Sequence, residues 1–147
     1  MSSVRHPTVL VLLAVLGFSA AACDVNRVQG PRTWTAGTQS VSGKTFVVNV
    51  RDTSGRIEDV EIDPQAVQGL GGPANPPGQP DVLIVPWTGG TCDEQTDIEV
   101  AANGSGLSIS ITTATAAGDC DAMGVAHAIR LTGSAAVPVA SVTVTMP

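Results

Sequence analysis

The sequence predicts an all-β protein, a single antiparallel β-sandwich of immunoglobulin-like size with about seven strands. Three features lead to this prediction. Apolar and polar residues alternate in several short segments, as is typical of strands that bury one face. Residues that favour turns separate these segments at intervals of about 8–12 residues. No segment shows a convincing helical repeat of its apolar residues.

The first two predicted strands form the clearest hairpin of the chain. Residues 45–51 (TFVVNVR) alternate between apolar and polar side chains, and residues 52–55 (DTSG) are typical of a turn. The alternation resumes in residues 56–62 (RIEDVEI). Ile57 is out of phase with the rest of that segment, so we expect a β-bulge near Glu58.

The middle of the chain has a different pattern. Residues 82–85 (VLIV) are continuously apolar, which is consistent with a strand that is buried on both faces. Pro86 cannot donate a backbone hydrogen bond, so it either ends this strand or marks the edge of a sheet. We expect Trp87 to fill the core between the two sheets.

The alternation returns in the second half of the chain. It is clearest in residues 107–112, where Leu107, Ile109 and Ile111 are predicted to point into the core. Serine and threonine occupy the positions between them and are predicted to point outward. The remaining strand signals lie in residues 97–100, 125–132 and 141–146.

The first 22 residues have the layout of a secretory signal peptide. Arg5 and the amino terminus supply positive charge, and Val9–Phe18 is an apolar run that ends in the small residues Ser19–Ala22. A membrane-spanning helix needs about 20 apolar residues, and this run is shorter. We therefore expect residues 1–22 to be removed on export.

The residues at the end of this leader, AAAC at 20–23, resemble a bacterial lipobox. The resemblance implies that Cys23 is acylated and becomes the first residue of a lipid-anchored protein. The match departs from the commonest pattern because Ala20 stands where leucine is usual. The alternative is an ordinary A-x-A cleavage site formed by Ala20 and Ala22, which would leave Cys23 as a free thiol.

The cysteine count favours the lipid anchor. The chain has three cysteines, and Cys92 and Cys120 lie far enough into the exported part to pair as a disulfide. A free thiol at Cys23 would be unusual in an exported protein, whereas acylation accounts for it. The leader and the cysteine pair together resemble those of small uncharacterised bacterial lipoproteins, a likeness that implies no activity.

The residue after the lipobox bears on location. In bacteria with two membranes and a lipoprotein-sorting pathway, an aspartate such as Asp24 resembles the signal that retains a lipoprotein at the inner membrane. In bacteria with one membrane, the plasma membrane is the only membrane available. We therefore expect the protein on the outer face of the plasma membrane.

These signals predict three parts: a signal peptide over residues 1–22, a lipidated tether over 23–40 and a β domain over 41–147. The tether is predicted because its residues show no sustained period and include Gly30, Pro31 and Gly37. Within the β domain, the segment 63–80 is rich in glycine and proline. It is expected to be either a mobile surface loop or a functional one.

Composition excludes some classes of partner. Lys and Arg number 7 against 13 Asp and Glu, so the chain carries a net charge of −6 and has no basic cluster that would bind nucleic acid. Two Trp, two Phe and no Tyr leave few aromatic platforms for sugars or bases. The expected contacts are the membrane, through the lipid anchor, and an envelope protein or a small ligand.

Carboxylates surround the cysteines of the predicted bridge. Asp93, Glu94, Asp97, Asp119 and Asp121 could supply the oxygen ligands that calcium prefers. The Asp-x-Asp-x-Asp loop of a calcium-binding hand is absent, and turns favour aspartate in any case. The favoured interpretation is that these residues occupy turns and the surface.

His127 is the only histidine beyond the leader. Its parity places it with Val125, Ile129 and Leu131 on an apolar face, where a histidine is usually hydrogen-bonded within the core or at its rim. The alternative is a copper site with Met123, but two ligands are too few once both distant cysteines are bridged. We expect no metal and no cofactor.

The sequence contains no catalytic constellation that we recognise. Nucleophilic catalysis needs a base beside Ser, Thr or Cys, and His127 lies in no nucleophile-elbow motif. We therefore predict a lipid-anchored, non-catalytic binding or structural module. The alternatives are a protein that handles calcium or copper, and a hydrolase that uses carboxylates of the loop 63–80 and of the cysteine region.

Overall fold

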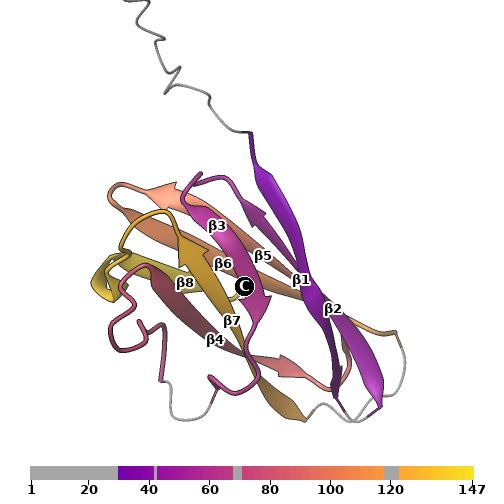
Figure 1. Ribbon diagram of the computed structural model, residues 1–147. Helices are drawn as coiled ribbons and strands as arrows, with labels where there is room; N and C mark the ends of the chain where they lie inside the picture. Colours follow the sequence, from indigo (N-terminus) through magenta and orange to yellow (C-terminus); the bar gives the residue numbers. More distant parts are fainter. Residues whose placement is uncertain (1–29, 42, 68–70, 118–122) are drawn as a thin grey trace, which may run out of the picture.

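The computed structural model describes residues 30–41, 43–67, 71–117 and 123–147, and within them eight β-strands form two sheets (Figure 1). The sequence predicted about seven strands. In chain order the elements are β1 (Arg32–Val41), β2 (Lys44–Asp52), β3 (Ile57–Ile62), β4 (Val82–Gly90), β5 (Asp93–Asn103), β6 (Gly106–Thr115), β7 (Gly124–Gly133), the short 3-10 helix η1 (Val139–Ser141) and β8 (Val142–Thr145).

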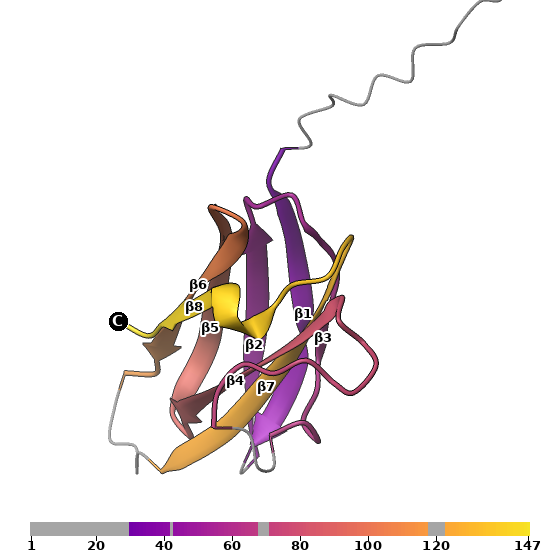
Figure 2. The same ribbon diagram turned by 90° about the vertical axis from the view of Figure 1, so that its left-hand side faces the viewer.

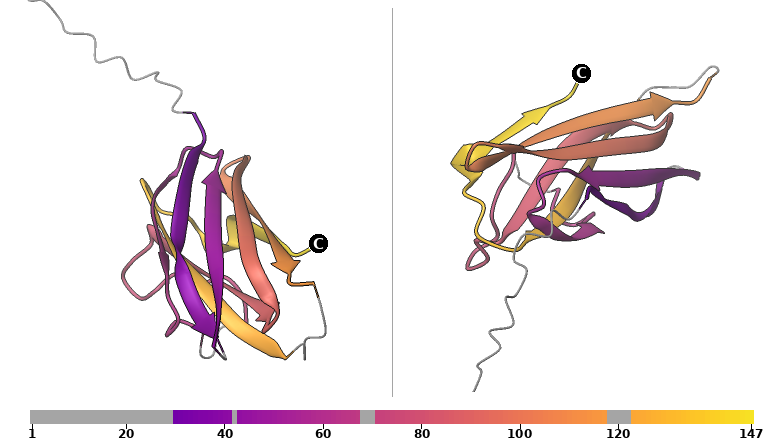
Figure 3. Two further views of the ribbon diagram at one scale, coloured as in Figure 1. Left: turned by 90° about the vertical axis from the view of Figure 1, so that its right-hand side faces the viewer. Right: turned by 90° about the horizontal axis from the view of Figure 1, so that it is seen from above.

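The two sheets differ in their topology. The larger sheet has the strand order β1-β2-β5-β6-β8, and the left panel of Figure 3 shows β1, β2 and β5 side by side. The smaller sheet has the order β3-β7-β4 and is antiparallel. In the larger sheet β2 pairs with β5, and β6 with β8, in parallel, so the prediction of an antiparallel fold throughout was wrong. Parallel neighbours need a crossover, and β3 and β4 of the other sheet supply it between β2 and β5.

Both sheets contribute to one hydrophobic core, which gives a sandwich-like arrangement with β3, β7 and β4 in front of the larger sheet in Figure 1. The prediction of an all-β protein is therefore confirmed. Buried aliphatic side chains of β2, β5 and β6 pack against those of β3, β4 and β7. The largest fully buried side chains of this core are Ile57, Leu83, Ile98, Leu107, Ile109, Ile129 and Leu131, and the larger Trp87 and Phe46 are 4 % exposed.

The strand with the clearest alternation has the predicted orientation. Leu107, Ile109 and Ile111 of β6 are buried in the core, and the residues between them are more exposed. β6 follows β5 through a tight turn at Gly104, which has a positive φ of 57°. Gly106 begins β6 where a Cβ atom would collide with the carbonyl oxygen of Ser141, so the chain passes closely there.

The predicted hairpin between β2 and β3 does not form, because the two strands lie in different sheets. The buried carboxylate of Asp52 directs the turn between them: Oδ1 accepts from the Ser54 backbone N–H at 2.8 Å and from its hydroxyl, and Oδ2 accepts from the Ile57 N–H at 3.3 Å. The bulge expected near Glu58 is confirmed, since the register with β7 shifts between Ile57 and Asp59.

The predicted tether was too long at its C-terminal end. Residues 32–40, assigned to the tether, belong to β1, which pairs with β2 in antiparallel fashion. Trp34 packs against the core, and the register of β1 shifts between Thr35 and Gly37. Half-buried and exposed residues alternate along β1 on either side of this shift, but none of its residues is fully buried. Residues 23–29 and the leader lie outside the described residues.

The C-terminal part of the chain completes the larger sheet. Figure 2 shows η1 leading into β8, and β8 pairs with Leu107–Ser110 of β6. Val142 and Val144, which alternate with threonine in the predicted strand 141–146, pack against the core. Met146, which shares that parity, lies beyond the strand and is 61 % exposed.

Candidate functional site

The loop between β3 and β4 lies over the outer face of the smaller sheet. Val82, Ile84 and Ala128 point to this outer face, and Ala66 and Val67 of the loop pack against them. The neighbouring side chains of β4 point into the main core. The prediction that residues 82–85 are buried on both faces is therefore confirmed, and the loop provides the second cover.

Backbone and amide contacts hold the far half of this loop to the sheet. Ala74 and Ile84 exchange two backbone hydrogen bonds, at 3.0 and 2.8 Å. The side chain of Asn75 donates to the carbonyl oxygens of Val82, at 2.7 Å, and Val137, at 3.2 Å. The loop thus adds a short β-bridge to the edge of β4. β4 is an edge strand of the smaller sheet, which agrees with one of the two interpretations of Pro86.

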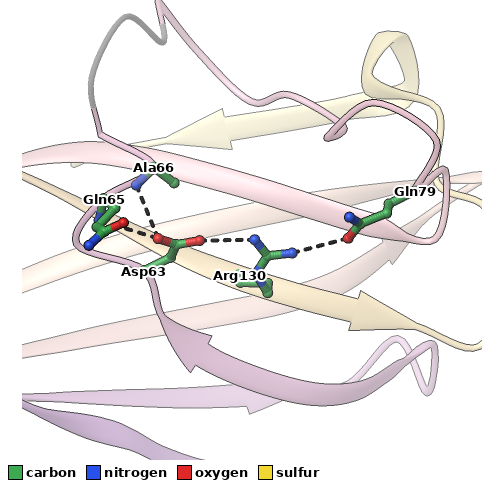
Figure 4. Close-up of polar contacts among 5 residues, drawn as sticks. All are labelled: Asp63, Gln65, Ala66, Gln79 and Arg130. Atoms are coloured by element: carbon green, nitrogen blue, oxygen red, sulfur yellow. Dashed lines mark hydrogen bonds and ion pairs between the residues drawn. The ribbon is translucent and has the colours of Figure 1, made fainter.

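Arg130 of β7 holds both ends of the loop, as Figure 4 shows. Its Nη2 donates to Asp63 Oδ2 at 3.0 Å, and its Nη1 donates to Gln79 Oε1 at 3.2 Å. The second carboxylate oxygen of Asp63 accepts from the backbone N–H groups of Gln65, at 3.2 Å, and Ala66, at 3.0 Å. Three protein donors therefore fix the Asp63 carboxylate, and one guanidinium spans the beginning and the end of the loop.

Two cavities lie beside the loop. The Arg130 cavity has a volume of about 430 Å³, and its walls include Asp63, Ala66, Pro76, Ile84 and Arg130. The two charged residues that line it form the ion pair already described, and the rest of its described lining is uncharged.

The Trp87 cavity lies where the loop, the edge of β4 and the end of β8 meet, and it has a volume of about 300 Å³. None of the described residues that line it is charged. Its walls include Val67, Pro73, Pro86, Trp87, Val144 and Met146. These residues come from segments far apart in the sequence, so the cavity exists only in the folded chain.

Trp87 belongs both to this wall and to the main core, which agrees with the prediction that it fills the space between the sheets. Its indole Nε1 is buried, and it is the only buried side-chain nitrogen or oxygen in the described part of the chain that has no hydrogen-bond partner. Most buried polar groups in proteins are hydrogen-bonded, so this indole nitrogen is an exception among the described side chains.

His127 lies behind Trp87 in the core. Its ring is 5.2 Å from the Trp87 ring and 4.6 Å from that of Phe46, with the latter pair edge to face. His127 Nδ1 lies 3.3 Å from Gln39 Oε1, and this amide oxygen accepts a hydrogen bond from the ring when Nδ1 carries the proton. The predicted role of a buried, hydrogen-bonded histidine is confirmed.

Asp93 is buried next to His127. Its carboxylate accepts from the Gly90 N–H at 2.7 Å and from the Thr115 hydroxyl at 3.4 Å. A Cβ on Gly89 would lie 2.7 Å from Asp93 Oδ2 and 3.1 Å from His127 Nε2, so this glycine allows the two side chains to approach. Burial lowers the pKa of His127 below its ordinary value of 6.5, and the charge of Asp93 partly opposes this shift.

The described candidates for a metal site are not gathered. Asp97 is exposed and accepts from Gln95 and Asn49, whereas Asp93 is buried. Met123 is 63 % exposed, in contrast to the buried His127. Asp119 and Asp121 lie outside the described residues. Among the residues that are described, no group of three or more His, Cys, Asp or Glu is placed to hold a metal.

The predicted modifications fall partly outside the described structure. Cys92 is buried directly before β5. Its predicted partner Cys120 and the predicted lipidation site Cys23 lie outside the described residues, so the bridge and the anchor stay predictions. In the portion of the chain that the structure describes, we find no helix with the length and apolar character needed to cross a membrane.

Sequence reasoning missed two of these contacts. The pair of Arg130 with Asp63 had a weak signal, because Arg130 shares its parity with the outward-facing Ala126 and Ala128. The approach of Asp93 to His127 had no signal in the sequence, because 33 residues lie between them and the two belong to strands of different sheets.

No family model, curated protein or solved structure matches the chain.

Proposed function

We propose that this chain is an exported, lipid-anchored protein of the cell envelope whose β domain is a non-catalytic binding module. The observation that carries the binding role is the loop 63–80, which Arg130 holds at both ends beside two cavities. Binding sites are commonly concave, mostly apolar and largely preformed, and loops held on a rigid scaffold often provide them.

The anchor part of the proposal rests on the leader. The apolar run, the small residues before Cys23 and the cysteine count support acylation at Cys23. Asp24 supports residence on the outer face of the plasma membrane. A disulfide between Cys92 and Cys120 is the second modification that we propose, because paired cysteines of exported proteins normally form one. The bridge would hold the start of β5 to the segment before β7.

A binding role fits the surroundings of His127 better than catalysis does. Gln39, Phe46 and Trp87 contact its ring, and none of these three side chains is a nucleophile. Asp93 is held by Gly90 and Thr115 in a buried position, as a structural carboxylate is. General acid–base catalysis needs the titrating group within reach of a substrate, and the exposed fraction of His127 is only 2 %.

Membrane fractionation tests the anchor, in a bacterial host that processes and acylates lipoproteins. Wild-type protein should remain with the plasma membrane, and intact-mass analysis should show acyl chains on a chain that begins at Cys23. Cys23→Ala should release the protein from the membrane fraction. Ser19→Ala, a similar small change within the leader, is the matched control and should leave the protein in the membrane. A wild-type mass without acyl chains, or a start at another residue, would refute the anchor.

A further inference from the structure

The chain enters the β domain at one end of the sandwich. β1 begins at Arg32, which pairs with Asp52 at the end of β2, and the turn 53–55 follows directly. The turn 104–105 between β5 and β6 lies at the same end, because β5 continues beyond Val100, its last residue paired with β2. Figures 1 and 2 show the start of β1 and the turn between β5 and β6 together at the upper end of the domain.

Arg56 joins the two turns at this end into one surface. Its Nη1 donates to the carbonyl oxygen of Ser105 at 2.6 Å, and its Nη2 donates to that of Gly104 at 3.0 Å. The guanidinium therefore fixes the turn after β5 beside the turn after β2. We call the surface made by residues 53–56 and 103–105 the entry end of the domain.

The chemistry of the entry end is compatible with a lipid surface. Residues 53–55 are Thr-Ser-Gly and residues 103–105 are Asn-Gly-Ser, so its turns carry short hydroxyl and amide side chains and no charge. The carboxylate of the neighbouring Asp52 is buried. Anionic headgroups repel carboxylates and attract arginine, and the charged side chain of the entry end is that of Arg56.

The connection to the proposed anchor is short. Eight residues, 24–31, separate Cys23 from the start of β1 at Arg32. A fully extended chain spans at most about 3.3–3.6 Å per residue, so the nine steps from Cys23 to Arg32 reach about 30–32 Å. A flexible chain of this length spans only about 15–18 Å on average. The headgroup layer takes up about 5–8 Å of this reach.

The opposite end of the domain is too far from the anchor to take the place of the entry end. β1 has ten residues and a strand rises about 3.3 Å per residue, so its last residue, Val41, lies about 30 Å from Arg32. If the turn after Val41 faced the bilayer, Arg32 would lie about 30 Å above the headgroups, whereas the tether reaches about 22–27 Å beyond them. Tether length therefore excludes the inverted orientation.

We propose that the entry end of the domain lies against phospholipid headgroups and that the turn between β1 and β2 points away from the membrane. This inference rests on the proposed lipid anchor at Cys23 and adds the surface through which the domain meets the bilayer. The short tether sets the orientation, and the uncharged turns allow the contact. The end at Val41 and Lys44 is then the part of the domain that faces other envelope proteins.

Two serines provide matched positions for a test of the orientation. Ser105 lies at the entry end and Ser40 lies near the far end of β1, and both are exposed. Ser105→Cys and Ser40→Cys are made singly in the full chain, labelled with a fluorescent maleimide without reductant, and reconstituted into phosphatidylcholine vesicles. Wild-type protein treated identically gives the background from the native cysteines. Phosphatidylcholine with a spin-labelled headgroup should quench the label at position 105 several-fold more strongly than the label at position 40.

The outcomes separate the orientation from the anchor. Intact-mass analysis of each reconstituted sample shows whether Cys23 carries acyl chains. Equal quenching at the two positions of an acylated protein, or stronger quenching at position 40, would overturn the orientation and leave the anchor in place. A sample without acyl chains would overturn the anchor and, with it, the orientation.

A longer tether tests the physical cause. Insertion of a Gly-Ser linker of about 20 residues between Gly30 and Pro31 raises the average span from about 15–18 Å to about 27–32 Å. The insertion lies before β1 and leaves every described strand unchanged. Quenching at position 105 should then fall several-fold towards the level at position 40. Unchanged quenching at position 105 would overturn the role of the tether in setting the orientation.

Discussion

The main core and the outer layer of the smaller sheet are both apolar, but they are built in different ways. The main core forms where regular strands of both sheets face each other. The outer layer consists of Val82, Ile84 and Ala128, and it is covered by the irregular loop 63–80. The core is closed by the repeating geometry of strands, whereas the outer layer is closed by a few specific polar contacts.

The difference shows how part of one sheet, in β4 and β7, can bury both faces without a third sheet. Arg130 donates to Asp63 and Gln79, and Asn75 donates to backbone carbonyl groups, so polar contacts around the loop hold its apolar residues in place. The contacts that close the outer layer are few, and each can be removed singly. We expect substitutions at the margins of the core to change the stability of the protein little. We expect the packing of the outer layer to depend on individual side chains.

The largest effect should come from the main core. Ile109→Ala empties a fully buried site between the sheets and should destabilise the protein by roughly 2–5 kcal/mol. Ser110→Ala, one residue further and pointing outward, should change stability by less than about 0.5 kcal/mol. Chemical denaturation of the two variants beside wild type measures both. A larger loss at Ser110 than at Ile109 would contradict the orientation of β6.

The same truncation in the outer layer should cost less. Ile84→Ala removes an equally large side chain that is also buried, but one of its covers is a loop that can move inward and reduce the cavity. The cost of such a substitution depends on how well the site can collapse, so we expect about 1–3 kcal/mol. Denaturation under the conditions used for Ile109→Ala gives a direct comparison. A loss greater than that of Ile109→Ala would mean that the loop is as rigid as a strand.

A smaller effect is expected from the arginine that holds the loop. Arg130→Met keeps an aliphatic stem of similar length and removes the donors to Asp63 and Gln79, so stability should fall by about 1 kcal/mol. The loop should also become more sensitive to limited proteolysis, with cuts within residues 63–80. Arg51→Met is the matched control, because Arg51 faces Glu99 at 3.8 Å with both side chains more than half exposed. Equal proteolysis of both variants would show that Arg130 does not hold the loop.

The smallest effect should come from the titration of His127. Its pKa is lower in the folded protein than the ordinary 6.5, because burial disfavours the charged form, so the unfolded chain binds the proton more readily. The stability that depends on neutral His127 is complete above about pH 6.5 and decreases as the pH falls below it, towards the folded pKa. Denaturation at several pH values between about 5.5 and 7.5 measures this slope. His127→Gln should reduce the slope, and an unchanged slope would assign it to other groups.

Local pattern in the sequence was enough to predict which side of several strands faces the core. Leu107, Ile109 and Ile111 alternate with polar residues, and a strand must place them all on one face. The continuous apolar run 82–85 similarly required burial on two faces, and the phase change at Ile57 required a bulge. These properties follow from the period of two residues in a β-strand, which any short segment carries within itself.

The partners of those strands were decided only in the folded chain. Residues 45–51 and 56–62 were predicted to pair with each other, but Asp52 turns the chain into the second sheet, and β2 pairs with β5 in parallel. β1 also escaped prediction, because none of its residues is fully buried and a register shift between Thr35 and Gly37 interrupts the alternation. Pairing depends on contacts between residues distant in the sequence, which a local pattern does not record.

The sequence by itself determined which stretches and which sides of strands are apolar. These are the run at 9–18 before Cys23, the inward sides of several strands, and the side of a strand that carries His127. The tertiary structure alone decided what those faces meet. It placed Asp93 beside His127, Arg130 between the two ends of the loop, and Trp87 at the boundary between the core and a cavity without charged walls. The physical reason is that alternation is a property of one strand, whereas a cavity or an ion pair needs segments that meet only when both sheets have formed.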